Sequence, residues 1–138
     1  MADGCCLTYE RPGGHHLRDA LNSSGVTIAA KRFVKGSEAG ILYPTAVADS
    51  IYGLVRLGAA TGLMCNVQLG GQGVATAGAA GVTAGSRLTI EANTGKVVDW
   101  APASGVNAAI VGKAINTAAA DGDCMMELLG PGAIGQGA

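Results

Sequence analysis

The sequence predicts an all-β fold: a small β-barrel or sandwich-like domain built from two pseudo-repeated halves, with an extended N-terminal arm. Short apolar segments recur at spacings of about ten residues, and glycine, asparagine or aspartate turns separate them, which is typical of all-β sandwiches and barrels. The order of segments in residues 25–70 is repeated in residues 81–130. The chain of 138 residues has the length of one domain. We therefore expect a single β domain over residues 25–132.

The repeat rests on blocks of sequence that match in the same order. GVTIAAKRF begins at Gly25 and GVTAGSRL at Gly81, an offset of 56, and AATGLMCNVQL begins 60 residues before AADGDCMMELL. Between these blocks two pairs of glycines match, at offsets of 55 and 59: Gly40 with Gly95 and Gly53 with Gly112. The offset grows along the second part of the repeat, as it does when loops lengthen between strands of fixed order.

Four strands are expected in each half. In the first half they fall within residues 32–34, 40–43, 50–55 and 63–69, and in the second within 87–92, 95–100, 109–115 and 124–129. Gly62 and Gly122 stand at turns that favour positive φ, and Asn93–Gly95 predicts a hairpin connection. The alanine-rich residues 107–123 have helical propensity, but Gly112 and its β-branched neighbours favour a strand.

The two ends of the chain lack counterparts in the repeat. Residues 1–24 contain the sequence RPGG, which disfavours both helix and strand. We expect an extended arm there, with no more than one helical turn near His16–Leu21. Residues 133–138 are expected to form an irregular tail.

Small side chains dominate the apolar part of the chain. Hydrophobic residues make up 49% of the sequence but aromatic residues only 4%, and there are 23 glycines. An alanine methyl group contributes far less to stability than a buried leucine, isoleucine, valine or phenylalanine side chain. Charged residues, at 14%, also fall below the usual ~25%, which leaves weakly polar surface for contact. Both features predict a domain that is stabilised by binding other proteins.

Charge and hydropathy argue against several classes of partner. Nine Lys+Arg against ten Asp+Glu give a formal net charge of -1, so no nucleic-acid partner is expected. No apolar run has the length of a membrane helix, and the N-terminus lacks a secretory signal pattern. We expect a chain that is made in the cytosol and has no membrane partner. Its four cysteines are then expected to be reduced thiols.

No motif predicts a catalytic, cofactor or metal site. His15 and His16 are adjacent and have no further ligand at a suitable spacing, so a solvated position is favoured. Cys65 and Cys124 lie in apolar strands without a neighbouring general base, and we interpret them as small hydrophobic residues.

Two polar or glycine-rich loops have simple structural interpretations. Residues 69–81 lack the Gly-Lys-Ser/Thr ending of a phosphate-binding loop, and are interpreted as a connection between the halves. Asp121 and Asp123 flank a glycine, where Asx hydrogen bonds within a turn are commoner than cation binding.

Candidate interface residues lie in the arm and at one strand end. Trp100, the single tryptophan, is either a core residue or an interface anchor, since tryptophan is enriched at binding hot spots. Tyr9 has no core of its own to enter if the arm is extended. Arms of this kind bind by adding a strand to the edge of a partner's sheet. The arm residues of this candidate interface are Leu7, Thr8, Tyr9, Glu10 and Arg11.

The chain resembles the capsid cement, or head decoration, proteins of tailed bacteriophages over roughly residues 25–132. The resemblance lies in the order VTAG, a short strand, GKVV, IVGKA, an alanine-rich stretch, GD, and a terminal apolar strand ending in LLGPG. It implies a small β-rich fold with an N-terminal arm, attached to the outer surface of the capsid. It also implies the major capsid protein as partner, a homotrimer, and stabilisation of the expanded head, with no catalytic residue or cofactor.

Two other classes of function remain open from the sequence. Biotinyl and lipoyl carrier domains also consist of duplicated β halves, but they carry their modified lysine at a hairpin tip in a different context from Lys96 in TGKVV. Another small β binding module, or an enzyme on a small barrel, is the remaining alternative, and no His/Asp/Cys constellation favours the enzyme.

Overall fold

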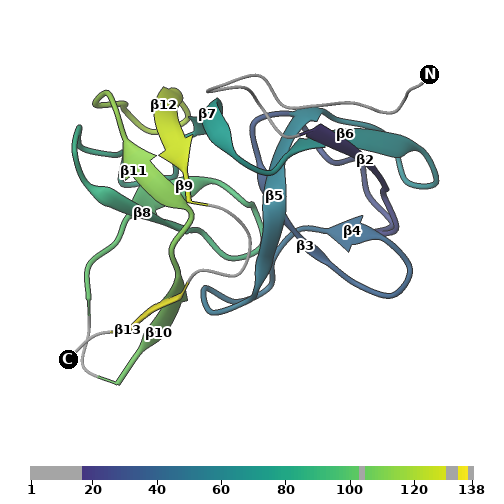
Figure 1. Cartoon of the computed structure of the whole chain (residues 1–138), viewed down its shortest axis with the longest axis horizontal. Coiled ribbons are helices and arrows are strands. Elements are labelled where there is room, and N and C mark those ends of the chain that lie inside the picture. Colours follow the sequence, from purple (N-terminus) through teal and green to yellow (C-terminus); the bar gives the residue numbers. More distant parts are fainter. Residues whose placement is uncertain (1–16, 103–104, 130–133, 137–138) are drawn as a thin grey trace, which may run out of the picture.

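The computed structural model describes residues 17–102, 105–129 and 134–136, and all regular elements in them are strands (Figure 1). The first half holds β2 (Leu17–Leu21), β3 (Phe33–Gly36), β4 (Ile41–Leu42), β5 (Ile51–Leu57) and β6 (Met64–Gln68). The second half holds β7 (Gly71–Thr76), β8 (Arg87–Ile90), β9 (Val97–Asp99), β11 (Gly112–Ala114) and β12 (Asp123–Leu128). Two short strands, β10 (Asn107–Ala109) and β13 (Ile134–Gln136), complete the set. The predicted all-β class is confirmed.

The two halves have the same sheet topology. The first sheet has the order β2-β6-β5-β3-β4 and the second the order β7-β12-β11-β8-β9, with antiparallel neighbours throughout. Each strand of the first sheet therefore has a counterpart at the same place in the second. The two sheets lie side by side, the first half on the right of Figure 1 and the second on the left. β10 and β13 form a separate two-stranded ribbon.

The strand register defines the true offset of the repeat. Val34 pairs with Gly53 in the first sheet, and Leu88 pairs with Gly112 in the second, which gives offsets of 54 and 59. The match of Gly53 with Gly112 is thus correct, whereas the match of Gly25 with Gly81 at 56 is two residues out of register. A shift of two residues keeps each side chain on its expected face, which is why the predicted strands remain right.

Two predictions for the chain ends are wrong. Leu17–Leu21, expected in the arm of residues 1–24 with a helical turn, forms edge strand β2 and pairs with β6 along its whole length. β2 occupies in the first sheet the place of β7 in the second, so the first sheet needs it to complete the repeat. Part of the tail of residues 133–138, expected to be irregular, forms β13 and pairs with β10. The interpretation of residues 69–81 as a connection between the halves is also wrong in part, because Gly71–Thr76 forms β7 and pairs with β12.

The turn predictions are confirmed except at one position. Gly62 has φ +86°, and Asn93 and Gly95, between β8 and β9, both have φ +70°. In the second half, however, the residue with positive φ is Asp121 (+62°) and not Gly122. Aspartate tolerates the left-handed region better than most residues, so the turn keeps its shape without glycine there. The alanine-rich residues 107–123 contain β10 and β11 and no helix, as predicted.

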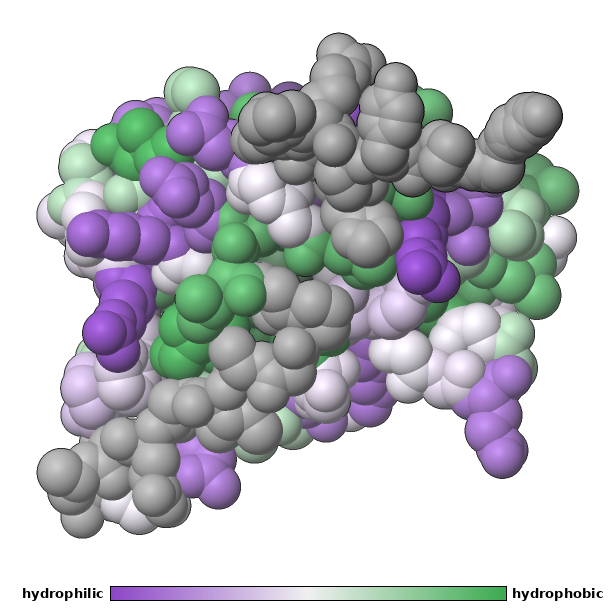
Figure 2. All heavy atoms as spheres, in the orientation of Figure 1, coloured by the Kyte–Doolittle hydropathy of each residue, from purple (hydrophilic) through white to green (hydrophobic). Residues whose placement is uncertain are grey.

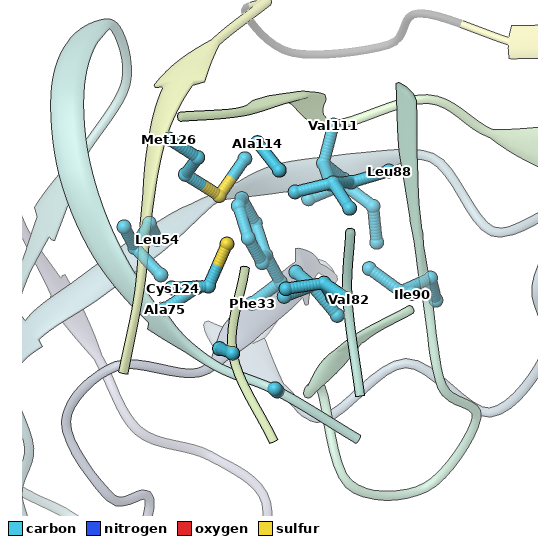
Figure 3. Close-up of a cluster of buried hydrophobic side chains, with 14 of the residues drawn as sticks. Phe33, Leu54, Ala75, Val82, Leu88, Ile90, Val111, Ala114, Cys124 and Met126 are labelled. Atoms are coloured by element: carbon cyan, nitrogen blue, oxygen red, sulfur yellow. The ribbon is translucent and has the colours of Figure 1, made fainter. Parts of the chain in front are cut away.

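The halves share one hydrophobic core. Phe33, Ile51 and Leu54 of the first half pack into a cluster of second-half residues, and Figure 3 shows the Phe33 ring at its centre near Cys124 and Met126. A second cluster lies within the first half. Its buried members are Ile28, Val34, Ile41, Val55, Cys65 and Val67. Because Phe33 and Val34 are consecutive in a strand, their side chains point to opposite faces and so enter different clusters.

Candidate functional site

A groove of about 360 Å³ lies between β5 of the first half and β7 of the second. We call it the interhalf groove. A volume of this size is within the usual range for ligand sites. The groove is lined by Lys31, Leu54, Val55, Arg56, Gln68, Gln72, Gly73 and Val74. It therefore combines two cations, two amides and an apolar wall, and none of the described residues in its lining is a carboxylate.

Lys31 forms one end of the groove and has an unusual backbone conformation. Its φ is +67°, whereas the equivalent residue of the second half, by the offset of 54, is Gly85 with φ +85°. A lysine at such a position costs about 1 kcal/mol or more relative to glycine, and strain of this kind is concentrated at functional sites. The Nζ of Lys31 lies 3.1 Å from Asp123 of β12, an exposed ion pair.

Lys31 also joins the two halves through its main chain. Its N–H donates to the carbonyl of Val55 (2.7 Å), and its own carbonyl accepts from the N–H of Thr76 (2.9 Å). The residue thus fixes the separation of β5 and β7 at this end. The Lys31 side chain is placed over the groove by these bonds and by its left-handed φ.

Arg56 lies on β5 at an irregularity of the sheet. The register of β5 with β6 shifts between Val55 and Leu57, so Arg56 is the extra residue of a bulge. Its side chain is exposed and, in the part of the chain that the structure describes, has no hydrogen bond or ion pair. Arg56 is therefore the uncompensated charge of the groove.

The edge of β7 that faces away from β12 forms the opposite wall. Thr76 directs its N–H to Lys31 and away from β12, and the carbonyl of Gln72 accepts from Nε2 of the buried Gln68 (2.6 Å). Alternate residues of a strand direct their N–H and C=O groups to the same side, and β7 pairs with β12 without a shift. The N–H and C=O of Val74 therefore point to the groove, between these two engaged positions.

An apolar row continues from the groove across the second sheet. Val74 pairs with Met125, whose carbonyl accepts from the N–H of Ile115, and the three side chains are 37%, 48% and 44% exposed. The residues of β2 and β6 equivalent to Val74 and Met125 are polar, Asp19 and Asn66. The β5 residue that pairs with Asn66 is Leu57, which follows the bulge at Arg56. Figure 2 shows that exposed hydrophobic residues on one face of the molecule form patches between polar side chains. We call Val74, Met125 and Ile115 the apolar row.

The residues predicted as an interface are placed only in part. Trp100 follows β9, is half-buried, and donates its main-chain N–H to the carbonyl of Arg87 (2.8 Å). It belongs to neither core cluster, so it is not a core residue. Residues 7–11 lie outside the described residues. The sequence interpretation did not identify the groove, although a lysine at the place of a glycine in the repeat was an available signal.

Cys65 and Cys124 occupy equivalent, fully buried positions. β2 pairs Ala20 with Cys65, and β7 pairs Ala75 with Cys124. Burial raises the pKa of both thiols, and the charge of Asp99 adds to the effect at Cys124. Both residues are thus small core side chains, as predicted.

Lys96, the residue that a carrier domain would modify, is engaged by an ion pair. Its Nζ lies 2.5 Å from Oδ1 of Asp121, and its side chain is only 20% exposed. The hydrogen bond from Lys96 lowers the pKa of the Asp121 carboxyl. This lysine does not project into solvent as a carrier lysine must.

Other chemical features are few in the described residues. They contain no group of three or more His, Cys, Asp and Glu residues that could hold a metal ion. No helix among them is long and apolar enough to span a membrane. A second crevice, between Phe33, Tyr52 and Leu128, has a volume of about 10 Å³, room for no more than a single water molecule.

Comparison with known proteins identifies a shared fold. No protein-family model and no curated protein sequence matches the chain. Among solved structures, the N-terminal base of the head fibre protein gp8.5 of bacteriophage phi29 is similar, with a TM-score of 0.62 and 14% sequence identity. The match covers 82% of this chain and 94% of that one. The two-half fold described above is therefore also found in a component of a phage head fibre.

Proposed function

We propose that this chain is a structural protein of a phage head, which binds the outer surface of the capsid and stabilises contacts between major capsid subunits. The observation that carries the proposal is the shared fold with the base of a phage head fibre, over most of both chains. The resemblance of residues 25–132 to head decoration proteins supports the same class of function, on the basis of sequence and not of structure.

The surface of the chain suits attachment to another protein. The apolar row exposes three hydrophobic side chains in register across β7, β12 and the residue after β11. Trp100 is half-buried outside the core, as expected for an anchor that completes its burial on binding. In this proposal the partner is the major capsid protein, and the chain binds as a homotrimer through residues 7–11, Trp100 and the apolar row.

Selective attachment explains how such a protein acts. A ligand that binds only the expanded state of the capsid stabilises that state by mass action. An interface of standard size, about 1,600 Å² in total, suffices for a stable complex. The carrier alternative is disfavoured because Asp121 holds Lys96 close to the protein surface.

Cosedimentation with cognate heads tests the proposal. Purified chain should pellet with expanded empty heads, should not pellet with unexpanded precursor shells, and should raise the denaturant concentration at which expanded heads disassemble. Equal binding to both forms, or binding to neither, would contradict it.

The duplicated fold supplies a matched control for the interface. Met125→Lys should weaken binding to expanded heads at least tenfold, because it places a charge in the apolar row. Asn66→Lys introduces a lysine at the equivalent position of the first half, where Asn66 already contacts Asp19. This variant should bind expanded heads within about twofold of the unmodified chain. If both variants bind like the unmodified chain, the apolar row is not the contact surface.

A further inference from the structure

We propose that the interhalf groove binds an extended acidic segment of another polypeptide, which pairs its main chain with Val74 and places a carboxylate against Arg56. This inference goes beyond the capsid role and does not depend on it. It rests on four features of the described residues: the groove itself, the open hydrogen-bonding groups of β7, an unpaired arginine, and a strained lysine.

The main-chain groups of β7 select an extended polypeptide. The N–H and C=O of Val74 face the groove, whereas the flanking groups of Gln72 and Thr76 are already hydrogen-bonded. One residue of an added antiparallel strand satisfies both groups of Val74 at once. Because the engaged flanking groups limit further pairing, the added segment is short and is centred on Val74.

The charges of the groove select an acidic side chain. Arg56 and Lys31 both line the groove, and no carboxylate does among the residues that the structure describes. Asp123 partly neutralises Lys31 from outside the lining, so Arg56 carries the uncompensated charge. A guanidinium binds a carboxylate through two parallel hydrogen bonds, which fixes both the distance and the orientation of the bound residue. The bulge in β5 directs Arg56 to this position.

The left-handed backbone of Lys31 supports a role for its side chain in binding at the groove. The second half uses glycine at the equivalent position, and glycine adopts the required φ without strain. Replacing Lys31 with glycine would relieve this strain and keep both of its main-chain hydrogen bonds. The lysine is therefore kept at a cost to stability, as is common for residues that contact a ligand.

Titration of the full-length chain with a synthetic peptide tests the inference. The probe is a blocked nine-residue peptide of alternating threonine and valine with a central aspartate, and the reference peptide has asparagine in its place. In 15N–1H correlation spectra, the amide resonance of Val74 should shift on titration and its exchange with solvent should slow. The aspartate peptide should bind at least tenfold more tightly than the asparagine peptide.

Three variants separate binding from folding. Arg56→Gln should weaken binding of the aspartate peptide about tenfold or more, whereas Arg87→Gln, which removes an exposed cation outside the groove, should leave it within twofold. Lys31→Gly should raise the thermal midpoint and still weaken binding. Any one of four outcomes would overturn the inference. Neither peptide binds, both bind with equal affinity, Arg56→Gln binds as tightly as the unmodified chain, or the chemical shifts change at the edge of β2 and not at that of β7.

Discussion

Substitution of Phe33 by alanine tests whether the two halves form one cooperative unit. Phe33 belongs to β3 of the first sheet, yet it is 2% exposed and packs in the cluster that contains Val82, Leu88 and Met126 of the second half (Figure 3). The substitution leaves a cavity at the contact between the halves. Removal of a buried phenylalanine side chain costs about 3–5 kcal/mol in free energy of unfolding.

That loss is large for a protein of this size. At about 0.05–0.15 kcal/mol per residue, a domain of this length has a free energy of unfolding of roughly 7–20 kcal/mol. The Phe33→Ala variant should therefore unfold at a temperature roughly 10–15 °C lower, in a single transition. Leu57→Ala, which truncates a side chain that is 68% exposed, is the control and should change the free energy of unfolding by less than about 0.5 kcal/mol.

Hydrogen exchange shows whether the effect reaches both halves. Amides of β5 in the first sheet and of β12 in the second should lose protection to the same extent in Phe33→Ala, because both strands contribute to the shared cluster. If β12 keeps its protection while β5 loses it, or if thermal unfolding splits into two transitions, the halves are independent units and the argument for a shared core fails.

Three further predictions concern single positions. Gly112→Ala should destabilise the chain by about 1–3 kcal/mol because the new methyl group overlaps the carbonyl oxygen of Glu127, whereas Gly36→Ala has open space around it and should be nearly neutral in urea unfolding. Burial raises the pKa of the Asp49 carboxyl, but hydrogen bonds from Lys35, Thr45 and Ala46 outweigh it and lower the pKa from 3.8 to about 2. Because the folded-state pKa is the lower one, this stabilisation is present above about pH 4 and lost as the pH falls through 2. Asp49→Asn should therefore flatten the pH dependence of stability in that window. The last prediction concerns Cys65 and Cys124 in a chain with Cys5 and Cys6 replaced by serine. Both thiols should react with a thiol reagent at pH 8 only on unfolding, because both are fully buried and burial raises their pKa. Rapid labelling of the native protein would contradict this.

The parts of the fold that were predictable from sequence are those with local signals. The strands around Phe33, Ile51 and Leu88 are short apolar segments with turn residues on both sides, and the turn at Asn93–Gly95 has the residues that positive φ requires. These signals depend on a few consecutive residues, so they survive an error of two residues in the alignment of the repeat.

The elements that were missed depend on partners distant in the sequence. In Leu17–Leu21 the apolar residues stand at positions 17, 20 and 21, so the segment has no apolar alternation to identify it as a strand, and in the structure only Ala20 is partly buried. It becomes one because β6, more than forty residues later, offers an open edge. The position of the interhalf groove depends in the same way on β5 and β7, which are distant in the sequence, and the only local signal for it was Lys31 at the place of a glycine in the repeat.

The hydrogen bond between Thr76 and Lys31 shows how one half of a duplicated fold becomes different from the other. The counterparts of these residues are Leu21 and Gly85, and no such bond joins them in the part of the chain that the structure describes. The first strand of the second half thus lies against the first half through a bond that β2 does not reproduce among the described residues. A site at this junction is specific to one edge strand, so the peptide of the proposed groove should bind with a stoichiometry of one per chain. Two equivalent sites per chain in a calorimetric titration would instead place binding on a feature that both halves share.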